Sequence, residues 1–217
     1  YQRWIYERIR PFLRGDILEI GCGIGNLTGF LLSHGKVGIS DINEEYLQIT
    51  EEKFRGHPNL KEIFLWDIRQ NPPESLTTLF DTIVCSNVLE HIEDDEAVLR
   101  NLYHYLPNGG RLILLVPAIK GLYNRLDLEL GHIRRYSKRE LGQMISKSGL
   151  RIILLTYFNF FGILGWFLNG TILRRPLLPE GQLRIFDRMV PFFIQIERVI
   201  PIRLGQSLIA VAERGKI

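Results

Sequence analysis

The residues best suited to chemistry form a run of glycines directly after a short apolar segment. Residues Asp16–Thr28 read DILEIGCGIGNLT, in which Gly21, Gly23 and Gly25 follow the apolar stretch Ile17–Ile20. Glycine has no Cβ, so a chain with this spacing turns sharply and lets a ligand touch its backbone. The helix expected after the turn offers unpaired N–H groups and the positive end of its dipole. The pattern therefore predicts a nucleotide-like ligand at the carboxyl end of a parallel strand.

The residues beside the glycines indicate which ligand this is. A dinucleotide fingerprint, G-x-G-x-x-G, requires a glycine at position 26, where this chain has Asn26. Glu19 stands two residues before the first glycine. A carboxylate at that place repels a pyrophosphate but suits a ligand that carries an ammonium and a sulfonium. The spacing thus disfavours, without eliminating, a nicotinamide-dependent oxidoreductase.

This combination resembles motif I, (D/E)-x-G-x-G-x-G, of the class I S-adenosylmethionine-dependent methyltransferases, in their small stand-alone form. The resemblance implies methyl transfer from S-adenosylmethionine by in-line displacement, with S-adenosylhomocysteine as product. A catalytically silent module that only binds S-adenosylmethionine is a further alternative. The implied cofactor-binding residues in the glycine turn are Glu19, Gly21, Cys22, Gly23, Gly25 and Asn26.

Further cofactor contacts are expected at the ends of three later strands. Asp41 lies 20 residues past Gly21, where a carboxylate accepts hydrogen bonds from both ribose hydroxyls; capping of the next helix by Asp41 or Asn43 is the competing interpretation. Ile42 would give the adenine an apolar face. By resemblance to the family, Asp67 contacts the adenine amine and Ile68 covers the ring, whereas an ordinary turn is the alternative for Asp67. The resemblance also places Asn87 and Val88 beside the methionine part.

Three residues are candidates for acid–base catalysis: His91, His132 and Tyr136. His91 ends the segment Ser86–His91, which resembles the family's segment after strand four, and an unperturbed imidazole titrates near pH ~6.5. His132 and Tyr136 belong to the run Gly131–Tyr136, which resembles a feature bordering the acceptor. Its two arginines would bind an anionic acceptor, or they would pair with Asp127 and Glu129 in a solvated loop. The spacing of histidines and cysteines predicts no metal site.

The elements that position these residues alternate between strands and helices. The alternation predicts an α/β fold with helices on both faces of a sheet. The resemblance to class I methyltransferases implies that this fold is Rossmann-like and doubly wound, with a seven-stranded sheet of order 3-2-1-4-5-7-6 and strand 7 antiparallel. We expect a single domain over residues 1–217, with an N-terminal helix at 1–13 and an insertion at about 158–203 that its prolines break into short helices. The connection 118–136 is expected to be a long loop. The expected strands are 17–20, 36–40, 60–65, 80–85, 111–116, 151–157 and 205–212.

Composition limits the class of partner. The formal net charge is +3, too small to argue for nucleic acid, but residues 151–217 carry nine Lys and Arg against four Asp and Glu. By resemblance to the family, such an insertion shapes the pocket for a small-molecule acceptor or a homodimer contact. Its basic, apolar character suits a lipid-like acceptor or a membrane surface, and plain packing on the sheet is the alternative. Cys22 and Cys85 are expected to be buried and reduced, as in the cytoplasm. The weakly polar run Ile152–Leu168 is short for a membrane span. Because the chain begins with Tyr1, we expect residues before it.

Overall fold

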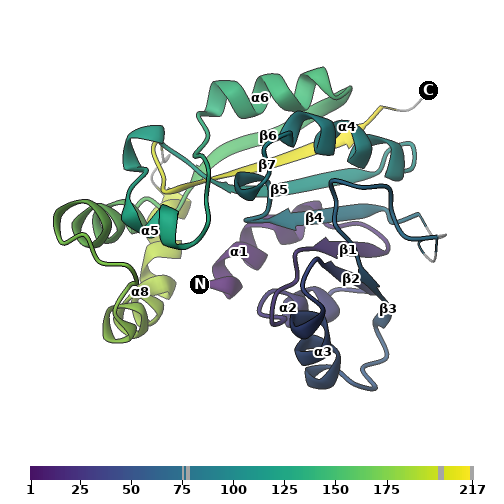
Figure 1. Cartoon of the computed structure of the whole chain (residues 1–217), viewed down its shortest axis with the longest axis horizontal. Coiled ribbons are helices and arrows are strands. Elements are labelled where there is room, and N and C mark those ends of the chain that lie inside the picture. Colours follow the sequence, from purple (N-terminus) through teal and green to yellow (C-terminus); the bar gives the residue numbers. More distant parts are fainter. Residues whose placement is uncertain (75, 77–78, 200–202, 216–217) are drawn as a thin grey trace.

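The computed structural model describes residues 1–74, 76, 79–199 and 203–215. Seven strands form one mixed sheet of order β3-β2-β1-β4-β5-β7-β6 (Figure 1). β7 runs antiparallel to both of its neighbours, and the pairs from β3 to β5 are parallel. The predicted fold class and strand order are therefore confirmed. The strands are β1 Ile17–Ile20, β2 Val37–Asp41, β3 Leu60–Leu65, β4 Thr82–Ser86, β5 Arg111–Pro117, β6 Leu150–Phe158 and β7 Ser207–Arg214.

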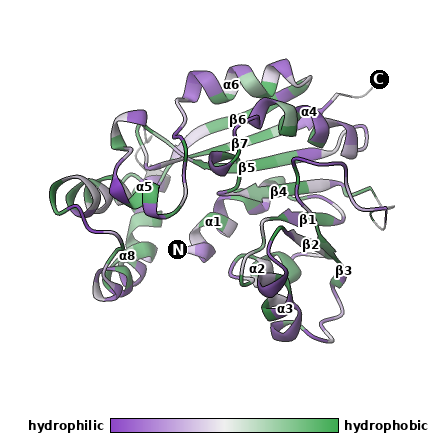
Figure 2. Ribbon diagram, in the orientation of Figure 1, coloured by the Kyte–Doolittle hydropathy of each residue, from purple (hydrophilic) through white to green (hydrophobic). Residues whose placement is uncertain are grey.

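Helices cover both faces of the sheet (Figure 1). One hydrophobic cluster joins the sheet to α4 Asp95–Tyr105 and α6 Lys138–Lys147. A second joins the opposite face to the remaining layer of helices. Figure 2 shows hydrophobic residues along β4 and β5, as expected for parallel strands buried on both faces. The helices of the second layer are α1 Gln2–Ile9, α2 Thr28–Leu32, α3 Glu44–Lys53 and α8 Glu180–Val199, and the short η1 Arg10–Phe12 extends α1.

Side-chain caps fix where several helices begin. Asn43 caps α3 by accepting from the N–H of Glu45 at 2.9 Å, so the cap of this helix is Asn43 and not Asp41. Ser137 and Glu140 form a capping box at the start of α6. A second capping box, Asn124 with Asp127, begins α5 Arg125–Glu129, which follows η3 Lys120–Leu122. The prediction of a long loop over 118–136 was therefore wrong, because this box nucleates a helix too short to show apolar periodicity.

The insertion between β6 and β7 holds α7 Gly162–Trp166, the π-helical η4 Phe167–Ile172 and the twenty-residue α8. α8 begins directly after Pro179 but continues through Pro191, so the prediction that Pro191 breaks it was wrong. Packing explains this, because Phe193 stacks on Phe161 with ring centroids 4.1 Å apart and belongs to the second cluster. Pro201 lies outside the described residues. Among the helices of the described residues, none combines the length and apolar character needed to cross a membrane.

Candidate functional site

The glycine turn, residues 21–26, leaves open space beside Gly23, and we call this space the cradle. A Cβ built on Gly21 would stand 2.4 Å from Val88, and one on Gly25 would stand 2.9 Å from Thr50, so packing requires glycine at both positions. Gly23 has a φ of +52°, yet a Cβ there would meet no described atom within 4 Å. Space beside a backbone of this conformation is what close approach of a ligand requires. The turn thus fits the nucleoside-type ligand predicted from its sequence.

Asp41 ties the end of β2 to this turn. The residue is buried, and its Oδ2 accepts from the N–H of Gly23 at 2.8 Å. Its Oδ1 accepts from the N–H of Asn43 at 2.9 Å. Each carboxylate oxygen has a second lone pair that these bonds leave available. Ile42 beside it is 61% exposed, so an apolar surface adjoins the carboxylate.

Glu19 lies beneath the turn. It is buried, and its Oε2 accepts a hydrogen bond of 2.6 Å from the hydroxyl of Thr28 in α2. Burial, with a smaller contribution from the charge of Asp41, raises the pKa of Glu19 to about 8. A cation bound beside this carboxyl would stabilise its ionised form. Within the turn, Cys22 is a buried free thiol and Asn26 is exposed.

The residues expected to border the adenine and the methionine part lie at the ends of β3 and β4. Asp67 accepts from Arg69 Nε at 2.8 Å and Nη2 at 2.6 Å, and these hydrogen bonds lower its pKa. In this structure Arg69 is thus the hydrogen-bond partner of the Asp67 carboxylate. The next residue, Ile68, is buried. Asn87 is exposed with a φ of +54°. Val88 contacts Gly21, as described above, which brings the end of β4 against the glycine turn.

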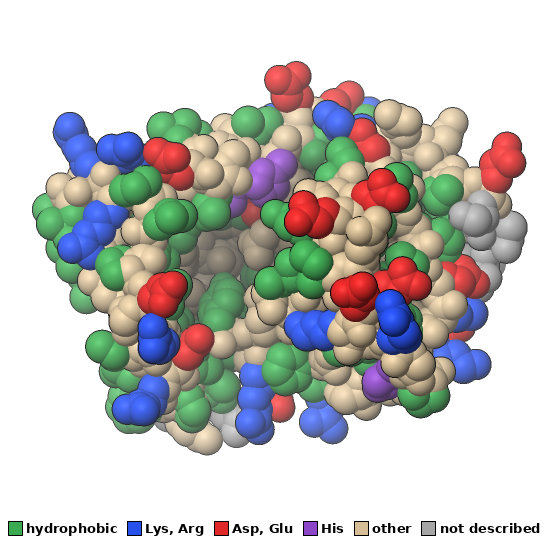
Figure 3. All heavy atoms as spheres, turned by 60° about the horizontal axis from the view of Figure 1, so that its bottom comes forward, with side chains coloured by type: hydrophobic (Ala, Val, Ile, Leu, Met, Phe, Trp, Pro, Cys, Tyr) green, Lys and Arg blue, Asp and Glu red, His purple; other side chains and the backbone are tan. Residues whose placement is uncertain are grey.

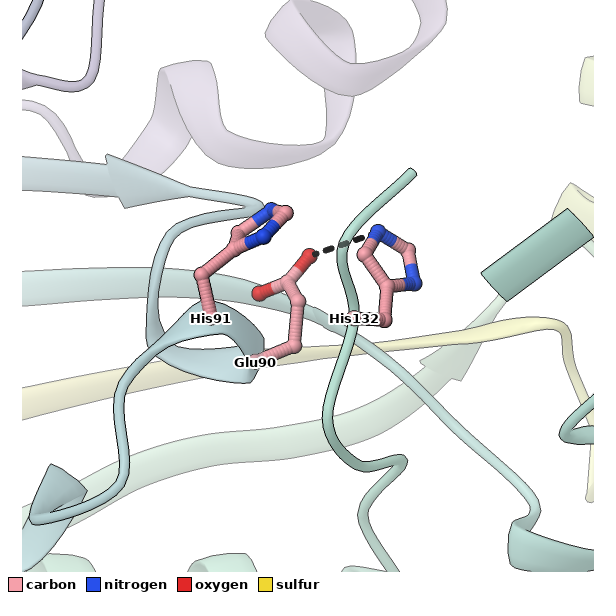
Figure 4. Close-up of side chains that lie close together, drawn as sticks. All are labelled: Glu90, His91 and His132. Carbon is pink, nitrogen blue, oxygen red and sulfur yellow. Dashed lines mark ion pairs between the residues drawn. The ribbon is translucent and has the colours of Figure 1, made fainter. Parts of the chain in front are cut away.

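Two histidines face each other at the same edge of the sheet (Figure 4). His91 ends η2 Leu89–His91, and its ring centroid lies 5.0 Å from that of His132. Glu90 stands between them and is fully buried, and burial raises its pKa to about 8. His91 is exposed on one side; partial burial lowers its pKa. The structure thus brings two of the three predicted catalytic residues together.

Tyr136 is not part of that pair. It is buried and donates its hydroxyl to Asp95 at 2.7 Å, and burial raises its pKa. This placement does not support the role of general base predicted for it. Arg134 also binds Asp95, while Arg135 is buried and donates from Nε to Asp127 at 2.9 Å. The competing interpretation is thus confirmed for the pair of Arg135 with Asp127, although Arg135 is buried rather than solvated. Arg134 pairs with Asp95 and not with Glu129.

Sequence reasoning assigned no role to Glu90 and considered Asp127 only as a partner of the arginines. Asp127 accepts from Trp166, Arg135 and His132, and it also takes part in the capping box of α5. Although burial alone would raise the pKa of Asp127, the hydrogen bonds from His132 and Arg135 hold it below its ordinary value. The available signals were the spacing Asn124-x-x-Asp127 and the position of Glu90 next to His91. The sequence alone did not show that His132 meets Glu90.

Figure 3 shows a hollow in the surface that faces the viewer, with hydrophobic side chains inside it and histidine at its rim. A separate groove of about 550 Å³ lies between α4, α6 and the segment 133–136. Charged side chains at that groove are paired with each other, such as Lys147 with Glu96 at 3.0 Å. The groove does not include the glycine turn or the two histidines among its lining residues.

Comparisons with known proteins agree with this geometry. Residues 18–112 match the family described as Methyltransferase domain. The ubiquinone/menaquinone biosynthesis C-methyltransferase of Klebsiella pneumoniae is 30% identical over 140 residues, which are 61% of this chain and 54% of that protein. An uncharacterised methyltransferase of Schizosaccharomyces pombe is 34% identical over 49% of this chain and 39% of its own length. The chain thus spans about half, or less, of these curated relatives.

Solved structures extend the likeness to the whole fold. An S-adenosylmethionine-dependent methyltransferase of Mesorhizobium loti superimposes with a TM-score of 0.66 at 16% identity, covering 97% of this chain and 98% of the other. The N-methyltransferase NodS of Bradyrhizobium japonicum, solved with S-adenosylhomocysteine, gives a TM-score of 0.62 at 14% identity over 98% of this chain and 84% of NodS. Together, these matches show a methyltransferase domain over residues 18–112 and, over the whole chain, the Rossmann-like fold of the solved S-adenosylmethionine-dependent methyltransferases.

Proposed function

We propose that this chain transfers a methyl group from S-adenosylmethionine to a small amphipathic acceptor, with S-adenosylhomocysteine as the second product. The observation that carries the proposal is the open cradle at Gly23, with the buried carboxyls of Asp41 and Glu19 close by. When bound, the cofactor supplies an electrophilic methyl group on a sulfonium. The chain's task is then to align acceptor, methyl and sulfur, which lowers a barrier by about 7–11 kcal/mol in well-oriented reactions.

Each side chain of the cradle has an assigned part. Glu19 and the backbone of the glycine turn would hold the amino-acid end, and Asp41 would accept from the ribose hydroxyls. Ile42 and Ile68 would cover the adenine. Asp67 would meet its amine after the surface ion pair with Arg69 opens; Arg69 is largely exposed, so this opening costs little.

We place the acceptor beside His91 and His132, on the side of the hollow that the insertion borders. The described part of the insertion exposes large apolar side chains, among them Leu164 at 74%, Ile185 at 64% and Phe192 at 62%. Such a surface supports an apolar or lipid-like acceptor and contact with a membrane surface. The likeness to a C-methyltransferase of quinone biosynthesis points the same way.

Calorimetric titration with S-adenosylmethionine, S-adenosylhomocysteine and NAD tests the cofactor. We expect saturable binding of the first two and none of NAD, and the reverse would favour the oxidoreductase alternative. Incubation with methyl-labelled cofactor and a panel of quinols, phenols, amines and fatty acids then tests transfer. Label that never leaves the cofactor, despite tight binding, would favour a catalytically silent module.

A further inference from the structure

Three side chains with metal-binding atoms meet at the carboxyl end of β4. Glu90 and His91 come from η2, and His132 comes from the segment after α5 (Figure 4). One ligand atom from each lies within 4.8 Å of the others. Glu90 Oε1 and His132 Nε2 are 3.8 Å apart. The backbone keeps the two segments together, because the N–H of Ile133 donates to the carbonyl of Glu90 at 2.9 Å.

Hydrogen bonds fix which nitrogen each imidazole offers. His91 Nδ1 lies 3.0 Å from the carbonyl oxygen of Gly131, which only accepts, so this nitrogen carries the proton. His132 Nδ1 lies 2.9 Å from Asp127 Oδ1, and this carboxylate is also paired with Arg135. Both rings therefore direct an Nε2 lone pair away from these partners. Histidines that bind metals are oriented in this way, by a carbonyl or a carboxylate behind the ring.

The carboxylate between the rings lacks the partners that a buried carboxylate needs. Glu90 is 0% exposed, and neither of its oxygens accepts a hydrogen bond from any residue that the structure describes. A buried carboxylate without hydrogen bonds is strongly unfavourable unless another charge compensates it. The charge of Arg135 compensates only part of this cost, since burial still raises the pKa of Glu90. A cation between Glu90 and the two Nε2 atoms would supply the rest.

We propose that Glu90, His91 and His132 bind one divalent first-row transition metal ion. Two imidazole nitrogens and one carboxylate oxygen suit Zn²⁺, Fe²⁺ or Mn²⁺, whereas Mg²⁺ and Ca²⁺ prefer oxygen ligands alone. Bound nitrogen and oxygen ligands lie about 2.0–2.2 Å from Zn²⁺. The three side chains must therefore draw closer together, and the exposed His91 is the one with room to move.

The position of the site indicates what the metal serves. Three protein ligands leave coordination positions open, as in catalytic rather than structural sites. Val88, two residues before Glu90, contacts the glycine turn, so the metal lies beside the proposed cofactor cradle. An oxygen of the acceptor is the ligand that this arrangement would take. That last step rests on the proposed function, but binding of the metal does not.

Metal titration of the full chain tests the site without reference to activity. After treatment with a chelator and its removal, we expect calorimetry with ZnCl₂ to show one equivalent bound and MgCl₂ to show none at the same concentrations. His91→Ala and His132→Ala should each weaken zinc binding by at least about 100-fold, beyond the effect of losing an outer-shell partner. Glu90→Gln, nearly equal in shape, should do the same.

His34→Ala is the matched control, because His34 is exposed and lies outside the cluster. His91 is itself exposed, so its variant should keep the thermal midpoint of the metal-free protein. Co²⁺ added in place of zinc should give visible absorption bands that disappear in His91→Ala. Absence of saturable zinc binding by the wild-type chain, or wild-type affinity in His91→Ala, would overturn the proposal. Neither outcome would bear on whether the cradle at Gly23 binds S-adenosylmethionine.

Discussion

The side chain of Val88 lies directly over Gly21, where a single added methyl group would stand 2.4 Å from the valine Cγ2. Gly21 belongs to the turn after β1, and Val88 to the segment after β4. The two strands are neighbours in the sheet, so their ends meet. This contact joins the proposed cofactor cradle to the segment that carries Glu90 and His91. The glycine at position 21 is thus required by packing, whereas a Cβ at position 23 would meet no described atom within 4 Å.

Gly23→Ala separates binding from stability. Because Gly23 has a positive φ and its Cβ position is open, alanine should destabilise the fold by only about 1–2 kcal/mol. The added methyl group also enters the cradle, so the loss of binding free energy for S-adenosylmethionine should be clearly larger than this loss of stability. Gly56→Ala is the control, since it has a φ of +76° and an equally open Cβ position elsewhere. Calorimetry and urea unfolding measure both effects; equal binding by the two variants would place the cofactor elsewhere.

Asp41→Ala should weaken cofactor binding about 10- to 100-fold, because a hydrogen bond to a charged group contributes about 1.5–3 kcal/mol. The variant also frees the N–H of Gly23 that Asp41 holds at 2.8 Å. Glu45→Ala, which removes an exposed carboxylate from the next helix, serves as control. An unchanged dissociation constant in Asp41→Ala would rule out the ribose assignment.

Glu19 should make stability depend on pH. Its pKa is raised from 4.5 to about 8, so between these values the folded chain binds the extra proton. Stability therefore decreases as pH rises through this interval, by about 1.4 kcal/mol per pH unit for this group, and levels off above it. Glu19→Gln should remove this dependence on pH. The free energy of unfolding of the variant should therefore rise relative to that of the wild type between pH 5 and about 8. Urea unfolding at several pH values measures the difference, with the exposed Glu51→Gln as control.

Asp127→Ala should destabilise the fold by about 3–5 kcal/mol, because it leaves the buried Arg135 guanidinium without its carboxylate. Glu129→Ala removes an acid two residues away in the same helix, but its pair with Arg125 is exposed. That control should lose about 0.5 kcal/mol or less. Similar unfolding free energies for the two variants would show that the buried pair contributes no more than the surface one.

Pro191→Ala should stabilise the chain by roughly 1–3 kcal/mol, because alanine restores a helical N–H and removes a clash with the preceding turn. Pro191 is exposed, so the change leaves the packed face of α8 intact. Gln195→Ala, also exposed on α8, controls for helix propensity alone. A lower thermal midpoint for Pro191→Ala would mean that the packing of α8 depends on the proline.

The strands could be predicted because each is a short apolar run followed by its own turn or helix signal, whereas their order in the sheet was implied by the resemblance to class I methyltransferases. The start of α6 was also predictable, since Ser137 and Glu140 form a local pattern. The start of α5 has an equally local signal in Asn124 and Asp127, but the short helix was obscured by its irregular surroundings. Continuation of α8 through Pro191 depends on contacts from distant segments, which no local pattern contains.

The cofactor cradle was predicted from spacing because all of its glycines lie within one turn. The histidine cluster was only half predicted. His91 and His132 were named as candidates, but Glu90 was given no role. Its neighbour His132 lies in the segment after α5, far from Glu90 in the sequence. Tyr136 was a candidate base because its run resembles a family feature that borders the acceptor. Its hydroxyl instead donates to Asp95, the first residue of α4.

The indole of Trp166 donates to Asp127 Oδ2 at 3.1 Å, and the guanidinium of Arg135 lies 4.9 Å from the centre of its ring. Through Trp166, the insertion therefore contacts Asp127, the carboxylate that orients His132. A change in this segment that removed or moved Trp166 would also change the hydrogen bonding of Asp127, and with it the orientation of the His132 imidazole. If the insertion selects the acceptor and the histidines react with it, as proposed, the two properties would change together in this chain.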